Sequence, residues 1–204
     1  MSLKVVGIST SPRANSNTDL LLRELLAGAE ATGGDVEYIA LRDKTIAPCA
    51  ECNACYKTGL CSVQDDYHGV LQEMLAADRL IVATPIFFMT VCAQCKVLID
   101  RCQCLWARKY VLKQPLIEGG GRDRQGAVIA IGGSGSTKMF DSIKLTMKYF
   151  FDVLEMTFAG GVYVNKVDSA GAIGDHPTAM SEARDLGRRL CLSAAGPPCI
   201  AGVL

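Results

Sequence analysis

The stretch that decides the fold has three consecutive parts: Lys4-Val-Val-Gly-Ile8, Ser9-Thr-Ser-Pro-Arg-Ala-Asn-Ser-Asn-Thr18 and Asp19-Leu-Leu-Leu-Arg-Glu-Leu-Leu-Ala-Gly-Ala-Glu-Ala31. Its first part is a short apolar run, and its second part is dense in hydroxyl and amide side chains. Its third part places apolar residues at the spacing of a helix face. The stretch therefore predicts a strand, a polar loop and a helix.

The same alternation continues along the chain. Further strands are predicted at 35–41, 79–83, 126–131 and 157–164, and further helices at 65–77, 90–110, 139–153 and 177–194. The run at 79–83 is almost wholly apolar, as in a strand buried on both faces of a parallel sheet. Five strands alternating with five helices predict one α/β domain over residues 1–204, built on a doubly wound parallel sheet. A ligand is expected where the loops after the first, third and fourth strands meet.

The polar loop after the first strand is predicted to hold a monophosphate. It precedes a helix, where unpaired N–H groups and the positive end of the dipole favour an anion. Asn17 or Thr18 can cap that helix. The stretch has neither the dinucleotide glycine pattern nor a P-loop, so side chains are left as donors. The candidates are Ser9, Ser11, Arg13, Ser16 and Thr18. An ordinary capped loop is the alternative.

Two more loops can contribute to the same site. Thr84-Pro85-Ile86-Phe87-Phe88-Met89 ends the apolar run at 79–83 and offers a rigid apolar wall that suits a flat conjugated ring. Plain core packing is the alternative for this segment. Gly132-Gly133-Ser-Gly-Ser-Thr137 follows the next strand, and its glycines let backbone approach a ligand closely. A flexible turn explains the second segment equally well.

A cysteine-rich loop at 47–64, here called the cysteine loop, follows the second strand. It reads Cys49-Ala-Glu-Cys52-Asn-Ala-Cys55 with Cys61 close behind. Four thiolates at this spacing can surround one tetrahedral or cubane metal centre, and the first three share the spacing of bacterial ferredoxins. The alternative is that they pack as small apolar side chains. In a parallel sheet we expect this loop beside the polar loop, at the carboxyl edge of the strands.

Ten cysteines without an apolar leader segment indicate a reducing, cytoplasmic compartment in which clustered thiols bind metal or react. Six cysteines lie outside the loop, and for these we prefer a structural role. Four of them fall in the predicted helix at 90–110 and two near the carboxyl end: Cys92, Cys95, Cys102, Cys104, Cys191 and Cys199. Cys92-Ala-Gln-Cys95 has the spacing of a redox or metal pair.

The charges argue against two classes of partner. The chain has 21 basic and 21 acidic residues, which leaves no electrostatic footprint for nucleic acid or an anionic membrane. Its apolar stretches, such as 80–91, are too short to span a bilayer. We therefore expect neither nucleic acid nor membrane as a partner.

The residues resemble a known family, the NADPH-dependent FMN reductase-like flavoproteins, and within it the iron-sulfur flavoproteins. The resemblance runs from Lys4 to about Trp106. Its carriers are Gly7-Ile-Ser-Thr-Ser-Pro-Arg13 with Ser16-Asn-Thr18, the four clustered cysteines with Asp65-Asp66, and Thr84-Pro-Ile-Phe-Phe88 followed by Lys96 and Ile99-Asp-Arg101. The chain departs from the family at Thr10, where relatives often carry glycine, and in its extra cysteines at 92, 95, 102 and 104.

The resemblance implies a flavodoxin-like, five-stranded parallel sheet of order 2-1-3-4-5 that binds FMN. The phosphate would lie in the loop from Ser9 to Thr18, which includes Asn17. The isoalloxazine would lie against Pro85, Ile86, Phe87, Phe88, Met89, Gly132 and Gly133. The resemblance also implies a [4Fe-4S] cluster on Cys49, Cys52, Cys55 and Cys61, and a homodimer or homotetramer in which the cluster loop of one subunit lies near the flavin of another.

The expected function is electron transfer between FMN and the cluster, with a small carrier such as ferredoxin, or NAD(P)H, as the external partner. The sequence requires no catalytic acid or base, because the flavin performs the chemistry. One alternative is an NAD(P)H-dependent FMN or quinone reductase without a cluster. Another is a non-enzymatic binding protein whose thiols hold structural zinc.

Overall fold

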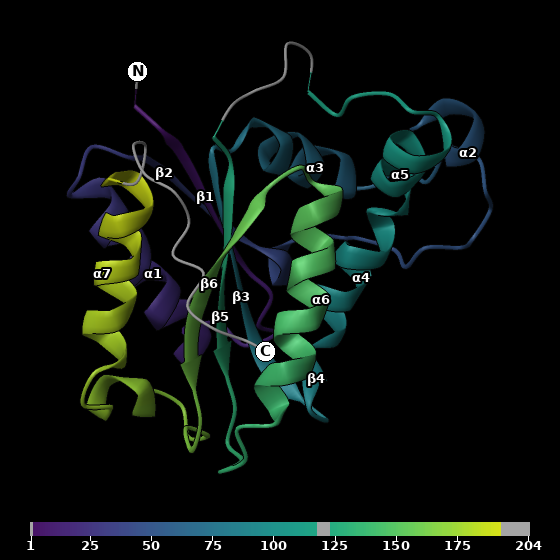
Figure 1. Cartoon of the computed structure of the whole chain (residues 1–204). Coiled ribbons are helices and arrows are strands. Elements are labelled where there is room, and N and C mark those ends of the chain that lie inside the picture. Colours follow the sequence, from purple (N-terminus) through teal and green to yellow (C-terminus); the bar gives the residue numbers. More distant parts are fainter. Residues whose placement is uncertain (1, 118–122, 193–204) are drawn as a thin grey trace.

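The computed structural model describes residues 2–117 and 123–192. Its centre is a parallel sheet of order β2-β1-β3-β5-β6, with β4 paired antiparallel to β3 (Figure 1). The strands are β1 (Lys4–Ser9), β2 (Asp35–Ala40), β3 (Arg79–Phe87), β4 (Thr90–Val91), β5 (Gln125–Ile131) and β6 (Thr157–Val164). Apart from the added β4, the predicted order 2-1-3-4-5 is confirmed.

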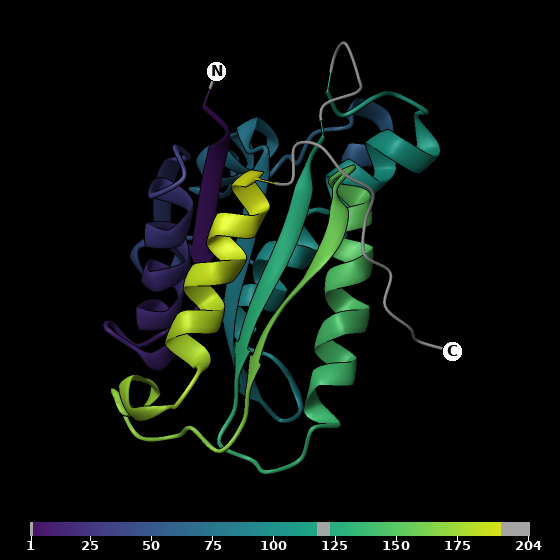
Figure 2. The ribbon, with the colours of Figure 1, turned by 60° about the vertical axis from the view of Figure 1, so that its left-hand side comes forward.

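Helices cover both faces of the sheet. Helices α1 and α7 pack on one face, and α3, α4 and α6 lie on the other (Figure 2). Their bounds are α1 (Asn17–Glu30), α2 (Cys55–Thr58), α3 (Tyr67–Ala76), α4 (Ala93–Arg101), α5 (Gln103–Trp106), α6 (Met139–Val153) and α7 (Ala179–Leu192), with the short turns η1 (Leu41–Asp43), η2 (Ala107–Val111) and η3 (Ala172–Asp175). The sheet therefore separates two apolar cores, as expected of a doubly wound domain.

The prediction of one helix over 90–110 is wrong: the segment begins with a short strand and is interrupted in its middle. Phe88 and Met89 have φ of 49° and 64°, which turn the chain back so that Thr90 pairs with Phe87. Helix α4 begins only after this hairpin, and a break at Cys102 separates it from α5. Left-handed backbone at two bulky residues has no sequence signature, which is why the apolar pattern looked like one helix.

Helices α1 and α7 approach each other closely through glycines. A Cβ atom on Gly187 would lie 2.0 Å from the carbonyl oxygen of Leu25, and one on Gly28 would lie 2.1 Å from that of Arg184. Only glycine allows backbones to come this near. This contact fixes α1, and with it the polar loop that precedes α1, against the rest of the domain.

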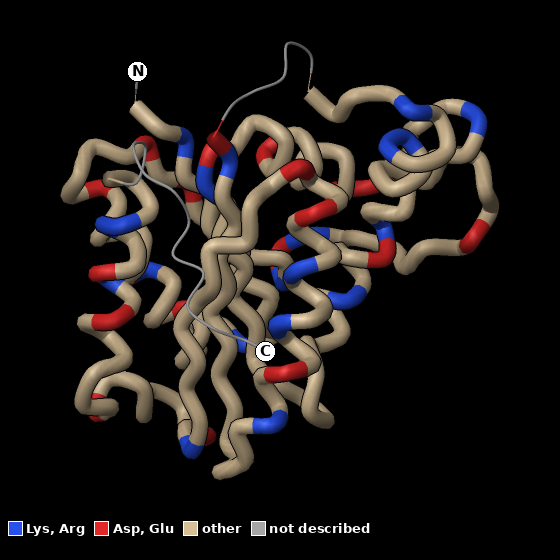
Figure 3. Tube along the Cα trace, viewed as in Figure 1, with Lys and Arg blue, Asp and Glu red and all other residues tan. Residues whose placement is uncertain are grey.

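Two sequence-based expectations concern residues that the structure does not describe. They are Cys199 and the last two residues of the helix predicted at 177–194. Within the described residues, acidic and basic residues are interspersed along the fold (Figure 3). None of the described helices is long and apolar enough to cross a bilayer.

Candidate functional site

One pocket lies at the carboxyl edge of the sheet and has a volume of about 130 Å³. It joins the loops after β1, β3 and β5, as the sequence predicted. Its lining residues are Ser11, Pro12, Arg13, Ser16, Asn17, Thr18, Pro85, Ile86, Phe87, Ile131, Gly132, Gly133, Val167 and Asp168. Four of these residues were not predicted: Pro12, Ile131, and Val167 and Asp168, which follow β6 and carry no motif.

The amino end of α1 forms one wall of this pocket. Ser16 is the N-cap: its Oγ accepts a hydrogen bond from the N–H of Asp19 at 3.1 Å, and the Asp19 carboxylate accepts one from the N–H of Ser16 at 3.3 Å. The prediction that Asn17 or Thr18 caps the helix is therefore wrong. The remaining N–H groups of the first turn have no acceptor within the helix, so they can bind an anion.

Ser9, which was predicted to contact phosphate, does not line the pocket. Its hydroxyl donates to the fully buried carboxylate of Asp19. Tyr38 donates to the same carboxylate at 2.9 Å, and Arg42 forms an ion pair with it at 3.0 Å. The network balances the charge of Asp19 beneath the pocket. Its sequence signal was the Ser16-x-x-Asp19 spacing of a capping box.

Asn17 lines the pocket but its amide holds a neighbouring loop. Its Nδ2 donates to the carbonyl of Ser169 at 2.8 Å, and its Oδ1 accepts from the N–H of Ile173 at 3.2 Å. These bonds tie the segment after β6 to the start of α1. The side chain thus shapes the pocket, while Arg13 stands exposed at its rim.

The apolar wall of the pocket comes from the end of β3. Ile86 and Phe87 line it with Pro85, whereas Phe88 and Met89 do not. Phe88 is fully exposed and Met89 is exposed beside it. Gly132 lines the same pocket, and a Cβ there would lie 2.8 Å from the sulfur of Met139, so the Met139 side chain would have to move. Apolar side chains and glycine backbone thus both line the pocket.

The four cysteines of the motif line a second pocket, of about 370 Å³. Residues from α4, α5 and the cysteine loop form it: Cys49, Ala50, Glu51, Cys52, Asn53, Cys55, Tyr56, Cys61, Ser62, Val63, Asp100, Arg101, Gln103 and Cys104. Glu51 and Asn53, on either side of Cys52, have φ of 51° and 58°. The backbone therefore folds tightly around the thiols.

The electrostatics of this cysteine pocket differ from thiol to thiol. A hydrogen bond with the Ser62 hydroxyl, 3.3 Å away, lowers the pKa of Cys52. Burial raises the pKa of Cys55, and the charges of Cys49, Cys52 and Cys61 raise it further. The mutual influence shows that the four thiols share one electrostatic environment. A bound cation or cationic cluster would relieve their repulsion.

Thiolates bind both zinc and iron-sulfur clusters, so the donor set has the chemistry of either centre. Within the described residues, no three His, Cys, Asp or Glu side chains are gathered closely enough to hold one metal ion. In a four-iron cluster each thiolate binds a different iron atom, so its sulfurs stand farther apart than the donors of a single zinc ion. In this structure the four thiols line one pocket.

The other described cysteines are free and mostly buried. Cys92 Sγ lies 3.2 Å from the Thr10 hydroxyl and 3.1 Å from the Thr10 carbonyl. Cys102 and Cys104 lie 3.6 and 3.3 Å from the Tyr67 hydroxyl. Burial raises the pKa of Cys102 to about 12. These contacts agree with a structural role, although Cys104 also lines the cysteine pocket.

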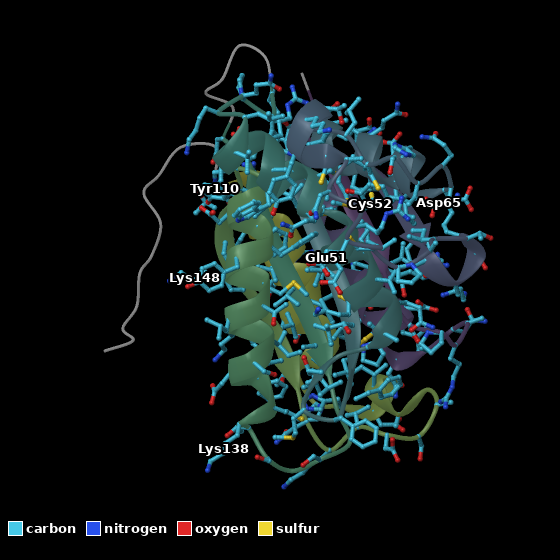
Figure 4. The ribbon with its side chains drawn as sticks, turned by 90° about the vertical axis from the view of Figure 1, so that its right-hand side faces the viewer. Glu51, Cys52, Asp65, Tyr110, Lys138 and Lys148 are labelled. Atoms are coloured by element: carbon cyan, nitrogen blue, oxygen red, sulfur yellow. The ribbon has the colours of Figure 1, made fainter. Side chains whose placement is uncertain are left out.

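The two pockets lie at opposite ends of α4, and they share no lining residue. The expectation that the cysteine loop lies beside the polar loop is therefore wrong. After η1 the chain runs back toward α3, where Thr45 and Ala47 donate to Asp66 and Asp65 at 2.7 and 2.9 Å. Figure 4 shows Cys52 and Asp65 in the upper part of the view and Lys138, which follows the glycine loop, near the bottom. Helix α4 is nine residues long, about 13 Å at ~1.5 Å per residue, and its last two residues line the cysteine pocket.

Comparison with known proteins places the chain in a family. The family model for NADPH-dependent FMN reductase matches residues 3–171. An iron-sulfur flavoprotein of Methanocaldococcus jannaschii is 32% identical, over 92% of this chain and 95% of the relative. An iron-sulfur flavoprotein of Methanosarcina thermophila is 32% identical, over 69% and 71%.

A solved structure agrees with this placement at the level of the fold. The NAD(P)H:quinone oxidoreductase of Methanothermobacter marburgensis superposes with a TM-score of 0.69 at 16% identity, over 93% of this chain and 98% of that one. The likeness shows a shared flavodoxin-like architecture. Because the family model matches residues 3–171 and the fold agrees, the chain belongs to the NADPH-dependent FMN reductase family of oxidoreductases.

Proposed function

We propose that the chain is an FMN-containing redox protein that transfers electrons between flavin and a [4Fe-4S] cluster. The observation that carries the proposal is the convergence of Cys49, Cys52, Cys55 and Cys61 on one pocket. The names of the relatives, iron-sulfur flavoproteins, support it. The cluster would replace the repulsion among four thiolates with bonds to iron.

The pocket at the carboxyl edge of the sheet fits the phosphate end of FMN. When bound, FMN supplies hydride and single-electron chemistry. N–H groups at the start of α1 and the hydroxyls of Ser11 and Thr18 would bind the phosphate, and Arg13 would add charge at the rim. A volume of about 130 Å³ is below the ~300–1,000 Å³ of ordinary ligand sites, so the pocket would hold only part of the cofactor. Pro85, Ile86 and Phe87 would border the ring.

Electron transfer would then take place between copies of the chain. The two pockets of one copy are separate and share no lining residue. In a homodimer or homotetramer, the cysteine pocket of one copy would meet the flavin pocket of another. NAD(P)H or a small one-electron carrier such as a ferredoxin would complete the exchange.

Cys52→Ala combined with Cys55→Ala tests the cluster. We expect the variant, purified without oxygen, to lose its iron and sulfide while keeping wild-type flavin content, because the flavin pocket contains neither residue. The visible spectrum and counts of iron, sulfide and flavin per chain measure this. Cys191→Ala, which removes a thiol outside the pocket, should leave iron unchanged. Iron retained by the double variant would show that the assignment of the centre is wrong.

A second candidate is an NAD(P)H-dependent FMN or quinone reductase that carries no cluster. The family assignment favours it, because the matching family is named for that activity. Wild-type protein with flavin but no iron, together with rapid steady-state oxidation of NAD(P)H, would support this reading. Iron with slow NAD(P)H turnover would support electron transfer.

A further inference from the structure

One buried ion pair closes the base of the cysteine loop. Arg101, the last residue of α4, donates from Nη1 to the carbonyl of Ala47 at 2.8 Å and from Nη2 to the carbonyl of Val63 at 3.0 Å. Asp65 accepts from the N–H of Ala47 at 2.9 Å. The two ends of the loop, on either side of the four cysteines, are therefore fastened to the same pair.

The pair itself is bidentate and largely shielded from water. The guanidinium of Arg101 contacts both carboxylate oxygens of Asp65, at 2.6 and 3.1 Å. Arg101 is 1% exposed, and the side chain of Asp65 is 10% exposed. The guanidinium also lies over the ring of Tyr67, 4.5 Å from its centroid. Such a pair is rigid, and breaking it by removing one partner leaves an uncompensated buried charge.

One donor of this guanidinium is left over. The Nε of Arg101 is buried and has no hydrogen-bond partner within the described residues. Arg101 lines the cysteine pocket, and Cys61 lies close to it. Burial lowers the pKa of Arg101, but Asp65 and Cys61 outweigh it and leave that pKa raised. A buried N–H without an acceptor is rare in folded proteins, so the orphan points to a group that the pocket receives.

We propose that Arg101 is a positioning residue that both closes the cysteine loop and tunes the cluster. Its Nη donors hold the ends of the loop, and its Nε–H is available to a sulfur in the pocket. A nearby positive charge and hydrogen bonds to sulfur stabilise the more negative, reduced state of an iron-sulfur cluster. Arg101 would therefore raise the reduction potential. The inference rests on the proposed function for its redox part and on the fold alone for its structural part.

Four substitutions separate the two roles. Arg101→Gln removes the charge and part of the fork, and Asp65→Asn removes the opposite charge at the same place. Arg101→Lys keeps the charge without the planar fork. Lys96→Gln is the control, because Lys96 belongs to the same helix but forms an exposed pair with Asp100 at 2.8 Å.

The midpoint potential of the anaerobic holoprotein reports the electrostatic role. We expect Arg101→Gln to lower the potential, weakening reduction by about tenfold or more, which is ~60 mV for one electron. Asp65→Asn should raise it. Arg101→Lys, which keeps the charge but lacks the Nε–H, should lower it less than Arg101→Gln does, and Lys96→Gln should leave it near the wild-type value. A role in loop structure alone does not predict opposite shifts for Arg101→Gln and Asp65→Asn. Shifts of the same sign, or none, would overturn this part.

Limited proteolysis of the metal-free chain reports the structural role. Arg101→Gln, Arg101→Lys and Asp65→Asn should each be cleaved within 47–64 several times faster than wild type, and Lys96→Gln should not. Equal cleavage rates would overturn the closure of the loop. A wild-type chain that binds no iron after anaerobic reconstitution would overturn the proposed function and the redox part with it, and proteolysis would still decide the structural part.

Discussion

At the scale of single residues, thiols of one chain differ in their surroundings. Cys52 is exposed, and its hydrogen bond with Ser62 lowers its pKa. Cys95 and Cys102 are buried, and burial raises their pKa values, that of Cys102 to about 12. Because the thiolate is the nucleophile, reactivity follows both access and pKa.

We therefore predict the order of alkylation of the metal-free protein. At about pH 8 a larger fraction of Cys52 than of an ordinary thiol is ionised, so iodoacetamide should modify Cys52 before the buried Cys95 and Cys102. Mass spectrometry of peptides after timed quenching measures the rates. In denaturant, where surroundings are lost, the rates should converge. Equal rates for Cys52 and Cys102 in the folded chain would contradict the assignment of Cys102 to the core.

The residues around Asp19 show how far sequence reaches at this scale. The polar loop was recognised as a helix start, and Ser11, Arg13, Ser16 and Thr18 do line the pocket. Ser9 could not be separated from them, because all have similar polar side chains. Ser9 ends β1, where side chains alternate between the two faces of the sheet, and this alternation places its hydroxyl against Asp19. Arg42, which completes that network, lies beyond β2 and gave no local signal.

At the scale of elements, the close contact of α1 with α7 yields a matched pair of predictions. Gly187→Ala places a methyl group against the backbone of Leu25, and this overlap should destabilise the fold by about 1–3 kcal/mol. The higher helix propensity of alanine should offset up to ~1 kcal/mol of that cost. Gly69→Ala, in α3, meets no atom within 4 Å and should stabilise by about 0.5–1 kcal/mol. Urea unfolding measures both. Equal effects would mean that α1 and α7 are not in close contact.

The strands were predictable because buried parallel strands are short, apolar and bounded by polar loops. The run at 79–83 appears as the buried part of β3. Two features were not predictable in the same way. The hairpin that forms β4 depends on left-handed backbone at Phe88 and Met89, and the course of the cysteine loop depends on hydrogen bonds to Asp65 and Asp66. Both are tertiary effects that leave no periodicity.

At the scale of the whole molecule, the hairpin tip is an exposed apolar surface beside the pocket proposed to bind flavin. Phe87, Phe88 and Met89 are all exposed. Adjacent exposed apolar side chains of this size are typical of contact surfaces. In the proposed oligomer this tip lies where another copy brings its cysteine pocket.

Phe88→Asp should therefore weaken self-association. A carboxylate at the tip would have to lose its water on contact, at a cost that an apolar ring does not have. Sedimentation velocity should show a smaller particle than wild type at equal concentration, with flavin still bound. Phe88→Leu, which keeps an apolar tip, should sediment as wild type. A monomeric wild-type protein, or an unaltered Phe88→Asp particle, would contradict the assembly.

Because the two pockets lie in different parts of the fold, each copy has two unlike contact regions, and a contact between them has a direction. If two copies are related by a two-fold axis, the cysteine pocket of each copy meets the proposed flavin pocket of the other. Each dimer then contains two complete electron-transfer pairs, and electrons need not leave it. If the same contact is made head to tail, it closes into a ring or continues as a filament. The symmetry of the assembly, and not any single side chain, would then decide how many flavins one electron can reach.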